Sequence, residues 1–299
     1  MKVFVIGATG LIGSHAARCM QANGHELTGL ARSTASQERL RSWGIVPVAG
    51  DVAEQPILRQ AALEADATVF APALGEEETA VVTWLLEQLA GSNKTFIFTS
   101  GTGVLAQRTF GDWSEDTFGE DDTFIPLRSL QGRLALENLV RGAGQRSVRG
   151  IVMRPPAVWA DGRPHSLVTS VAKSAKKTGA ACYVGKGLNL YANVHAQDLG
   201  RAFNLVLEKG EPGAVYHAVA GEVPNRWIAE MVARVLGCPT RSITMDEAIE
   251  LWGKFAALVV MGVCSRSRSP KTRSLGWAPE RTDMLAAAEA VLREGQACG

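Results

Sequence analysis

The chain has 299 residues and a net charge of +1, with 31 Lys and Arg against 30 Asp and Glu. At ~150 residues per domain, this length predicts about two domains, or one large core with a smaller addition. A nearly neutral chain has no overall field that attracts nucleic acid or an anionic membrane. Hydrophobic residues make up 46% of the sequence, which excludes a disordered chain.

Cysteine usage indicates a reducing compartment, and the apolar runs argue against a membrane span and a signal peptide. The five cysteines are odd in number, far apart and without a CxxC motif. That pattern argues against a disulfide framework and against a zinc site, so no metal is expected. The longest apolar run, near residues 255–264, is too short to cross a bilayer as a helix. Glycines interrupt the apolar N-terminus, which argues against a signal peptide, and we expect a cytoplasmic protein.

Short apolar and β-branched runs alternate with helical patterns through the first half of the chain. Such alternation predicts right-handed βαβ units and a parallel sheet with helices on both faces. The expected strands are Val3–Ile6, Glu26–Ala31, Ile45–Ala49, Ala67–Ala71, Thr95–Thr99 and Val148–Met153. The expected helices are Leu11–Ala22, Gln37–Trp43, Ile57–Leu63, Thr79–Leu89 and Arg128–Arg141.

The pattern becomes less regular after Pro155. Helices are expected at Leu167–Lys177, Ala196–Leu207, Trp227–Leu236 and Met284–Arg293, with short strands near Tyr191–Val194 and Val215–Ala218. We therefore expect a sheet domain over residues 1–154 and a small mixed lobe over residues 155–299. Segments at about 191–220 are expected to return from the lobe to the sheet.

A glycine-rich turn, Gly7–Gly13, directly follows the first strand and opens the first helix. Gly7 permits the tight turn, Gly10 lets a pyrophosphate approach the backbone, and Gly13 lets the helix pack closely on the strand. The helix N-terminus offers free N–H groups and a positive dipole end to phosphates. The fold is therefore expected to be a doubly wound, mostly parallel α/β sheet of the Rossmann type. The dinucleotide-binding residues expected here are Gly7, Thr9, Gly10, Leu11, Ile12 and Gly13.

The end of the second strand distinguishes the two nicotinamide dinucleotides. NAD sites usually place Asp or Glu there for the ribose hydroxyls, whereas this chain has Arg32 and Ser33. A guanidinium can bind a 2′-phosphate through two hydrogen bonds, and a serine can donate a third. The sequence therefore predicts that NADP(H) is preferred over NAD(H).

Several motifs occur together in an order that resembles a known family. They are Gly7–Gly13, Gly50–Val52, Phe70–Ala73, Phe98–Gly101, Arg154–Pro156, Val194–Leu199 and Gly276–Pro279. The set resembles the extended short-chain dehydrogenase/reductases, often called NAD-dependent epimerase/dehydratases. The resemblance implies further cofactor contacts at the carboxyl ends of strands, where open parallel sheets bind ligands. These contacts are Asp51, Val52, Ala71, Pro72, Ala73, Thr99, Ser100, Pro155 and Pro156.

The catalytic positions of this family are not matched. The family uses a Tyr followed four residues later by a Lys, together with a Ser, and none of the three tyrosines here precedes a Lys in that way. The resemblance places Ser129 at the Tyr position and Arg133 at the Lys position. Ser100 and Thr102 flank the family's Ser position. An aliphatic hydroxyl is too weak an acid to replace a phenol, although Arg133 can still hold the cofactor ribose.

Other candidate residues lie in the second half of the chain. His165 follows a predicted pocket loop and is a candidate general acid. His195 and Asp198 are expected to form a structural pair at a helix start. An acidic loop at 112–122 is expected to cover the site, and the basic stretch 265–274 is either a solvated loop or a rim facing an anionic ligand. The residues expected to line the substrate cleft are Trp159, Tyr191, Asn193 and Arg266.

The sequence thus predicts an NADP(H)-dependent oxidoreductase that acts on a small carbonyl, alcohol or imine and uses a non-standard proton donor. The donor is left open among Ser100, Thr102, His165 and water. Two alternatives remain: a catalytically silent NADP(H)-sensing regulator, and an enzyme of the epimerase/dehydratase type. The expected partner is a small-molecule substrate, with no nucleic acid and no membrane, and a homodimer is left open as the assembly.

Overall fold

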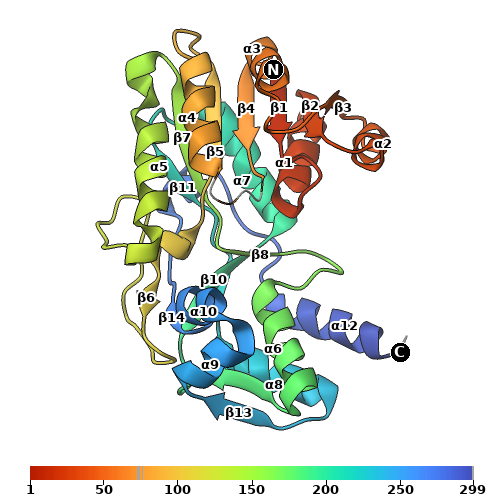
Figure 1. Cartoon of the computed structure of the whole chain (residues 1–299), viewed down its shortest axis with the longest axis vertical. Helices are drawn as coiled ribbons and strands as arrows, with labels where there is room; N and C mark the ends of the chain where they lie inside the picture. The colour runs from red at the N-terminus through yellow and green to blue at the C-terminus, as the bar shows by residue number, and fades with distance from the viewer. Residues whose placement is uncertain (73–74, 76, 298–299) are drawn as a thin grey trace.

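The computed structural model describes residues 1–72, 75 and 77–297. Figure 1 shows two parts, a large sheet flanked by helices and a smaller lobe at one end of it. The chain crosses between the two parts more than once, because strands and helices from the second half belong to both.

The large part is built on a seven-stranded sheet in the order β11-β7-β5-β4-β1-β2-β3. All neighbouring strands in it run parallel. The chain moves outward from β1 in one direction through β2 and β3, and in the other through β4, so the strand order reverses beside β1. Open sheets bind ligands at such a reversal. The strands are β1 (Lys2–Ile6), β2 (Glu26–Ala31), β3 (Val46–Ala49), β4 (Ala67–Phe70), β5 (Thr95–Thr99), β7 (Arg149–Arg154) and β11 (Val215–His217).

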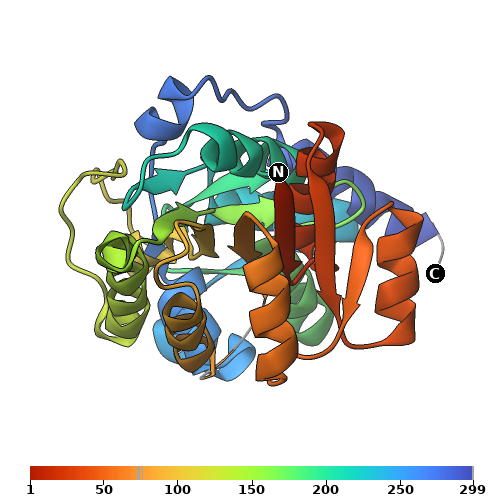
Figure 2. The same cartoon turned by 90° about the horizontal axis from the view of Figure 1, so that it is seen from above.

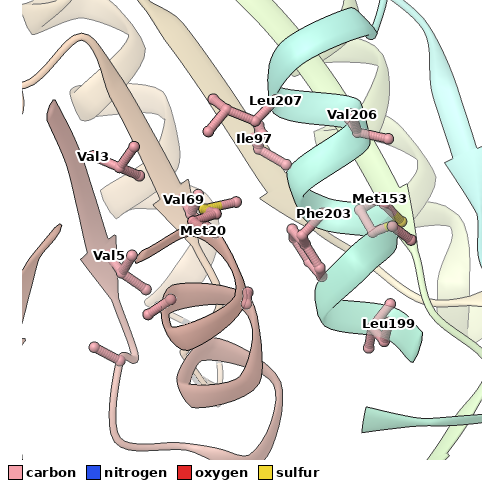
Figure 3. Close-up of a cluster of buried hydrophobic side chains, with 14 of the residues drawn as sticks. Val3, Val5, Met20, Val69, Ile97, Met153, Leu199, Phe203, Val206 and Leu207 are labelled. Atoms are coloured by element: carbon pink, nitrogen blue, oxygen red, sulfur yellow. The ribbon is translucent and has the colours of Figure 1, made fainter. Parts of the chain in front are cut away.

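Helices bury both faces of this sheet, as Figure 2 shows from above. On one face, side chains of α1 and α7 meet the strands: Figure 3 shows Met20 of α1 beside Val69, and Phe203 of α7 near Ile97 and Met153. On the other face, α3, α4 and α5 cover a second apolar layer. Burial on both faces accounts for the continuous apolar runs of the strands. The helices are α1 (Leu11–Ala22), α2 (Thr34–Ser42), α3 (Gln55–Glu64), α4 (Glu78–Gln88), α5 (Gln131–Arg141) and α7 (Ala196–Lys209).

The smaller lobe has its own core, formed mainly by α6 and α8 over short strands. A three-stranded sheet in the order β12-β10-β8 leads into it from the large sheet, and β9 pairs with β13 at its far end (Figure 1). A two-stranded pair, β6 with β14, joins the first half of the chain to the second. The strands are β6 (Gln107–Arg108), β8 (Ala157–Trp159), β9 (Ala181–Val184), β10 (Leu190–His195), β12 (Gly221–Pro224), β13 (Thr240–Ile243) and β14 (Val263–Cys264). The helices are α6 (Ser166–Thr178), α8 (Asn225–Leu236), α9 (Met245–Trp252), α10 (Lys254–Ala256), the π-helical turn Ala257–Met261 and α12 (Met284–Ala297). Between the last two, α11 (Pro270–Ser274) returns to the large part and packs on β11 and α7.

The expected fold class is confirmed: a mostly parallel α/β sheet covered on both faces, with a smaller lobe. Several short elements of the lobe were not among the expected ones, notably β8, β9, β13 and α9. Their strands span three or four residues, too few to show a period in the sequence. Within the described ranges, no helix is both long and apolar enough to cross a membrane.

Candidate active site

Two cavities lie along the carboxyl edge of the large sheet. The first, here called the glycine-turn cavity, measures about 310 Å³. The second, here called the junction cavity, measures about 320 Å³ and lies between the sheet and the smaller lobe. The glycine-turn cavity is lined by Ile6, Gly7, Thr9, Gly10, Leu30, Ala31, Arg32, Ser36, Asp51, Val52, Ala71 and Pro72. The junction cavity is lined by Ile12, Ser100, Gly101, Gly103, Val104, Leu130, Arg133, Pro155, Pro156, Ala157, His165, Ser166, Tyr191, Phe255, Val259 and Val260.

The three glycines of the turn have different structural roles. Gly7 has φ +86°, and a Cβ on it would lie 2.5 Å from the carbonyl oxygen of Ala71. A Cβ on Gly13 would lie 2.3 Å from the carbonyl oxygen of Gly7, so the helix could not pack as it does. Gly10 has φ −76°, and a Cβ there would meet only the Gly7 oxygen, at 3.2 Å. Protein packing therefore requires glycine at 7 and 13, whereas at 10 glycine mainly keeps the cavity open.

Helix α1 begins beside this cavity with its N-terminus free. Its N-cap is Gly10, which has no side chain to cap the helix, and the first turn carries no acidic residue. The first N–H groups of a helix have no partner within the helix, and its dipole makes that end positive. Uncapped N–H groups beside an open cradle fit a pyrophosphate. The turn and the start of α1 would therefore hold the phosphates of a dinucleotide, and the residues present fit that cofactor.

Arg32 and Asp51 lie at the far end of the same cavity. The Arg32 side chain is 80% exposed, and its Nε lies 3.5 Å from a carboxylate oxygen of Asp51. Ser33 is the N-cap of α2, where its Oγ accepts a hydrogen bond from the Ser36 N–H at 3.2 Å. Ser36 itself lines the cavity. An exposed pair of this kind is weak, so the guanidinium is free to turn toward an anion.

Ser100 connects the junction cavity to a buried ionic network. Its Oγ donates a 2.5 Å hydrogen bond to Oε1 of Glu137, which is 0% exposed. Arg154, 2% exposed, binds both oxygens of the same carboxylate. Nη1 of Arg154 lies 3.4 Å from Nε2 of His217. Because the Ser100 proton is donated to a buried carboxylate, this hydroxyl presents acceptor lone pairs to the cavity.

Arg133 is the cation of the junction cavity, and it is paired. Its Nη2 lies 2.7 Å from Oε2 of Glu78, a buried residue in the first turn of α4, and its guanidinium lies over the Phe98 ring. Burial raises the pKa of the Glu78 carboxyl, and Arg133 opposes that rise. The pair fixes the guanidinium at the cavity wall and neutralises much of its charge.

His165 and Tyr191 bring an imidazole and a phenol into the junction cavity. Nδ1 of His165 accepts a hydrogen bond from the Leu167 N–H at 3.1 Å, so the ring caps α6 and its proton is on Nε2. Burial lowers the pKa of His165 to about 4, which leaves the ring neutral at pH 7. Burial raises the pKa of Tyr191, which keeps its hydroxyl protonated.

The expected cofactor residues divide between the two cavities, with a few outside both. Gly7, Thr9, Gly10, Arg32, Asp51, Val52, Ala71 and Pro72 line the glycine-turn cavity, and Ile12, Ser100, Arg133, Pro155 and Pro156 line the junction cavity. Leu11, Gly13, Ser33 and Thr99 line neither. Ala73 lies outside the described residues.

Two of the expected catalytic residues lie away from the junction cavity. Ser129 is exposed in a 3₁₀ turn, Arg128–Leu130, that precedes α5. Thr102 is fully buried, and its carbonyl accepts a hydrogen bond from Ser265 at 3.0 Å. Neither residue is among those that line the cavity, although each is next to one that does.

Of the four residues expected to line the substrate cleft, one, Tyr191, lines the junction cavity. Trp159 and Asn193 are buried, and the indole N–H of Trp159 donates to Oδ1 of Asn193 at 3.0 Å. The Trp159 ring also packs edge-on against His195, whose Nδ1 caps α7. Arg266 pairs with Glu222 at 3.0 Å and therefore faces protein groups.

The acidic loop and the basic stretch bind each other. Arg268 pairs with Asp122 at 2.7 Å, and Lys271 pairs with Asp121 at 2.6 Å. The buried carboxylate of Glu120 accepts hydrogen bonds from the backbone N–H groups of Lys271 and Thr272. Paired in this way, the cations of the basic stretch are not free to face an anionic ligand, and no residue of either segment lines the glycine-turn or the junction cavity.

Several residues that line the junction cavity were not expected there. They come from the loop after β5, from the N-cap of α5, from the starts of β8 and α6, and from α10 and the π-helical turn. The last two elements carry no motif, and an apolar run alone does not say what it covers. The residues are Gly103, Val104, Leu130, Ala157, Ser166, Phe255, Val259 and Val260.

Comparisons with known proteins identify the family. Residues 3–219 match the NAD dependent epimerase/dehydratase family. An uncharacterized protein of Saccharomyces cerevisiae is 33% identical over 302 residues, covering 95% of this chain and 97% of that protein. A decarboxylating sterol-4-alpha-carboxylate 3-dehydrogenase of Dictyostelium discoideum is 25% identical, covering 74% of this chain and 72% of that protein. The crystal structure of a dTDP-glucose 4,6-dehydratase from Streptomyces venezuelae with NAD bound shares the fold, with a TM-score of 0.76 at 19% identity over 100% of this chain and 98% of that one. The resemblance expected from the motifs is confirmed, and the chain belongs to the NAD-dependent epimerase/dehydratase family.

Proposed function

We propose that this protein is an NADP(H)-dependent oxidoreductase for a small, neutral, largely apolar carbonyl or alcohol. The observation that carries the proposal is the composition of the junction cavity. The cavity is lined both by expected cofactor residues, such as Ser100 and Pro155, and by the polar groups of His165 and Tyr191. Such an arrangement suits a substrate oxygen held opposite a nicotinamide ring.

The dinucleotide would extend from the glycine turn to the junction cavity. The start of α1 would bind its phosphates, Asp51 and Val52 would lie by the adenine, and Arg133 and Ser100 would lie by the nicotinamide ribose. When bound, the dinucleotide supplies or accepts a hydride at the nicotinamide ring. The lining residues hold the substrate beside that ring, exclude water and donate hydrogen bonds to the substrate oxygen.

The lining of the junction cavity supports a neutral, apolar substrate. Among its described lining residues Arg133 is the single permanent cation, and Glu78 pairs with it. A substrate phosphate or carboxylate would therefore enter without a free partner, at a large cost in desolvation. The volume is at the small end of the ~300–1,000 Å³ range of ligand pockets, and the nicotinamide takes part of it. The residues that would contact the substrate are mostly aliphatic or aromatic: Val104, Leu130, Ala157, Phe255, Val259 and Val260.

Cofactor choice gives the first test. Arg32 is exposed at the end of β2 and is held only by the weak pair with Asp51, so a 2′-phosphate can recruit it. We expect isothermal titration to show NADPH binding at least several-fold tighter than NADH. Arg32→Glu should weaken NADPH binding by about 1.5–3 kcal/mol, as expected for a charge-assisted hydrogen bond. The matched control is Arg39→Glu at the other end of α2, which should leave NADPH affinity unchanged. Equal affinity for NADPH and NADH would show that Arg32 does not select the 2′-phosphate.

Two other functions remain as candidates, each with an observation in its favour. Family membership supports an epimerase or dehydratase. The resemblance to the family places Ser129 and Arg133 at its Tyr and Lys positions, and such a replacement supports a silent NADP(H) sensor. Aldehydes and ketones offered with NADPH separate the three. Steady consumption of NADPH supports the oxidoreductase. Tight NADPH binding with no turnover of any carbonyl favours the sensor, and conversion of a nucleotide sugar without net cofactor consumption favours the epimerase or dehydratase.

A further inference from the structure

A phenol lies in the junction cavity on an element other than the family's catalytic helix. Tyr191 is in β10, and its hydroxyl lies 3.3 Å from the position that a Cβ on Gly103 would occupy. Gly103 belongs to the turn that follows β5, so the phenol oxygen reaches across from the lobe to the sheet. Ser129, which the resemblance places at the family's tyrosine position, is exposed and does not line this cavity.

The other hydroxyl and imidazole groups of the cavity are poor proton donors. The Ser100 proton is donated to Glu137, and an aliphatic hydroxyl is a much weaker acid than a phenol, whose pKa is near ~10. His165 is neutral, and donating its remaining proton would leave an imidazolate. Ser166 is another aliphatic hydroxyl, placed 3.3 Å from the His165 ring. Among the lining residues described, Tyr191 is thus the group best able to protonate an oxygen.

We propose that Tyr191 is the proton donor of this enzyme, replacing the tyrosine that the family carries on its helix. This inference rests on the proposed function. In the reductive direction, the carbonyl carbon takes a hydride from the reduced nicotinamide dinucleotide, which supplies the electron pair. The O–H bond of Tyr191 breaks, and its proton forms the new O–H bond of the alcohol. Tyr191 then recovers a proton from water after the product leaves.

The Ser265 hydroxyl can stabilise the Tyr191 anion. Burial raises the pKa of Tyr191 and the neighbouring Ser265 hydroxyl opposes that rise, while Ser265 Oγ itself donates to the Thr102 carbonyl at 3.0 Å. Ser265 is fully buried, so no water competes for it. When Tyr191 loses its proton, rotation of the Ser265 hydroxyl redirects that donor from the carbonyl to the phenolate.

The experiment pairs turnover with a binding measurement that needs no turnover. Tyr191→Phe removes only the hydroxyl, and Tyr183→Phe is the matched control, since Tyr183 lies under Arg226 and does not line the cavity. With benzaldehyde, hexanal and cyclohexanone as probes, kcat should fall ~10²–10⁴-fold in Tyr191→Phe, the usual contribution of a general acid. The solvent deuterium isotope effect on the wild-type kcat should also be lost.

Benzamide serves as the probe for binding, because it has a carbonyl but is not reduced. Its Kd for the NADPH-saturated protein should rise about tenfold in Tyr191→Phe and stay unchanged in Tyr183→Phe, with the Kd of NADPH constant in both. If Tyr191→Phe and wild type have equal kcat or equal affinity for benzamide, Tyr191 is not the proton donor, and the proposed function still stands. If the wild-type protein binds NADPH but neither reduces the probes nor binds benzamide, the proposed function fails and the role of Tyr191 falls with it.

Discussion

At the scale of single residues, the glycine turn shows what a motif can and cannot predict. The motif assigns Gly7 and Gly13 to packing and Gly10 to the ligand, and the close approaches around each glycine agree with that division. A short motif next to a strand can do this because every contact it needs lies within a few residues. Side chains that depend on distant partners are harder. Tyr191 and Asn193 are both on β10, yet Tyr191 lines the junction cavity while Trp159 covers Asn193.

Because the glycines differ in role, substitutions at Gly10 and Gly13 should have different effects. Gly10→Val should abolish dinucleotide binding while the fold stays intact, because φ at residue 10 suits any residue and the new side chain fills the pyrophosphate cradle. Gly13→Ala should instead lower the free energy of unfolding, because its Cβ would lie 2.3 Å from the Gly7 oxygen. Circular dichroism, urea unfolding and NADPH titration distinguish the two effects. A folded Gly10→Val variant that still binds NADPH would place the phosphates elsewhere.

At the scale of elements, the sequence predicted long helices with a clear hydrophobic period better than short elements without one. The expected helix Leu11–Ala22 has the bounds observed for α1, and the other long helices agree within a few residues. The expected helix from Arg128 begins instead as a 3₁₀ turn, so that α5 starts at Gln131. The π-helical turn Ala257–Met261 has no period of its own in the sequence, and its register is set by contacts with the rest of the lobe. π-Helical turns of this kind are frequent at functional sites.

The segment formed by α10 and this turn should set substrate preference. Phe255 is 69% exposed, yet it lines the junction cavity, and Gly253 before it has φ +85°, a conformation that favours glycine. We expect Phe255 to lose solvent contact when an apolar substrate binds. Burying such a ring contributes about 1.5–3 kcal/mol, so Phe255→Ala should raise KM for benzaldehyde by roughly 10- to 100-fold.

Phe110→Ala is the control for Phe255→Ala, since Phe110 is also exposed but does not line the cavity. It should leave KM for benzaldehyde and the Kd of NADPH unchanged. 4-Carboxybenzaldehyde should be a poor substrate of the wild-type protein, because its carboxylate finds no free cation in the cavity lining described here. An unchanged KM in Phe255→Ala, or a preference for the charged aldehyde, would contradict the proposed substrate class.

At the scale of the whole molecule, the sequence was sufficient for the fold class but not for the way the two parts meet. Alternating strands and helices report local connectivity, and chirality then restricts the topology. Many tertiary contacts join residues far apart in the chain, such as Asp122 with Arg268. No local pattern encodes such pairs, so the acidic loop was expected over the site although it is bound to the basic stretch.

Two histidines, the buried His217 and the half-buried His165, connect the stability of the whole molecule to pH. Nδ1 of His217 faces the Arg268 carbonyl at 2.9 Å and donates to it, so Nε2 is the unprotonated nitrogen beside Arg154. Protonation would bury a second cation next to that guanidinium. Burial, together with Arg154, lowers the pKa of His217 to about 3, and burial lowers that of His165 to about 4. Both rings are therefore neutral in the folded protein over a range where they are charged in the unfolded chain.

The sign of the resulting pH dependence follows from proton linkage. Between about pH 6.5, the ordinary histidine pKa, and about pH 4, the unfolded chain binds more protons than the folded protein at both residues. The free energy of unfolding should thus fall as pH decreases through this range, by up to about 1.4 kcal/mol per pH unit for each histidine. His217→Gln keeps a side-chain donor and acceptor but cannot titrate, so it should remove one such contribution from the slope. Urea unfolding at pH 7.5, 6 and 5 measures that slope, and an identical slope in wild type and His217→Gln would show that His217 is not held neutral by its burial beside Arg154.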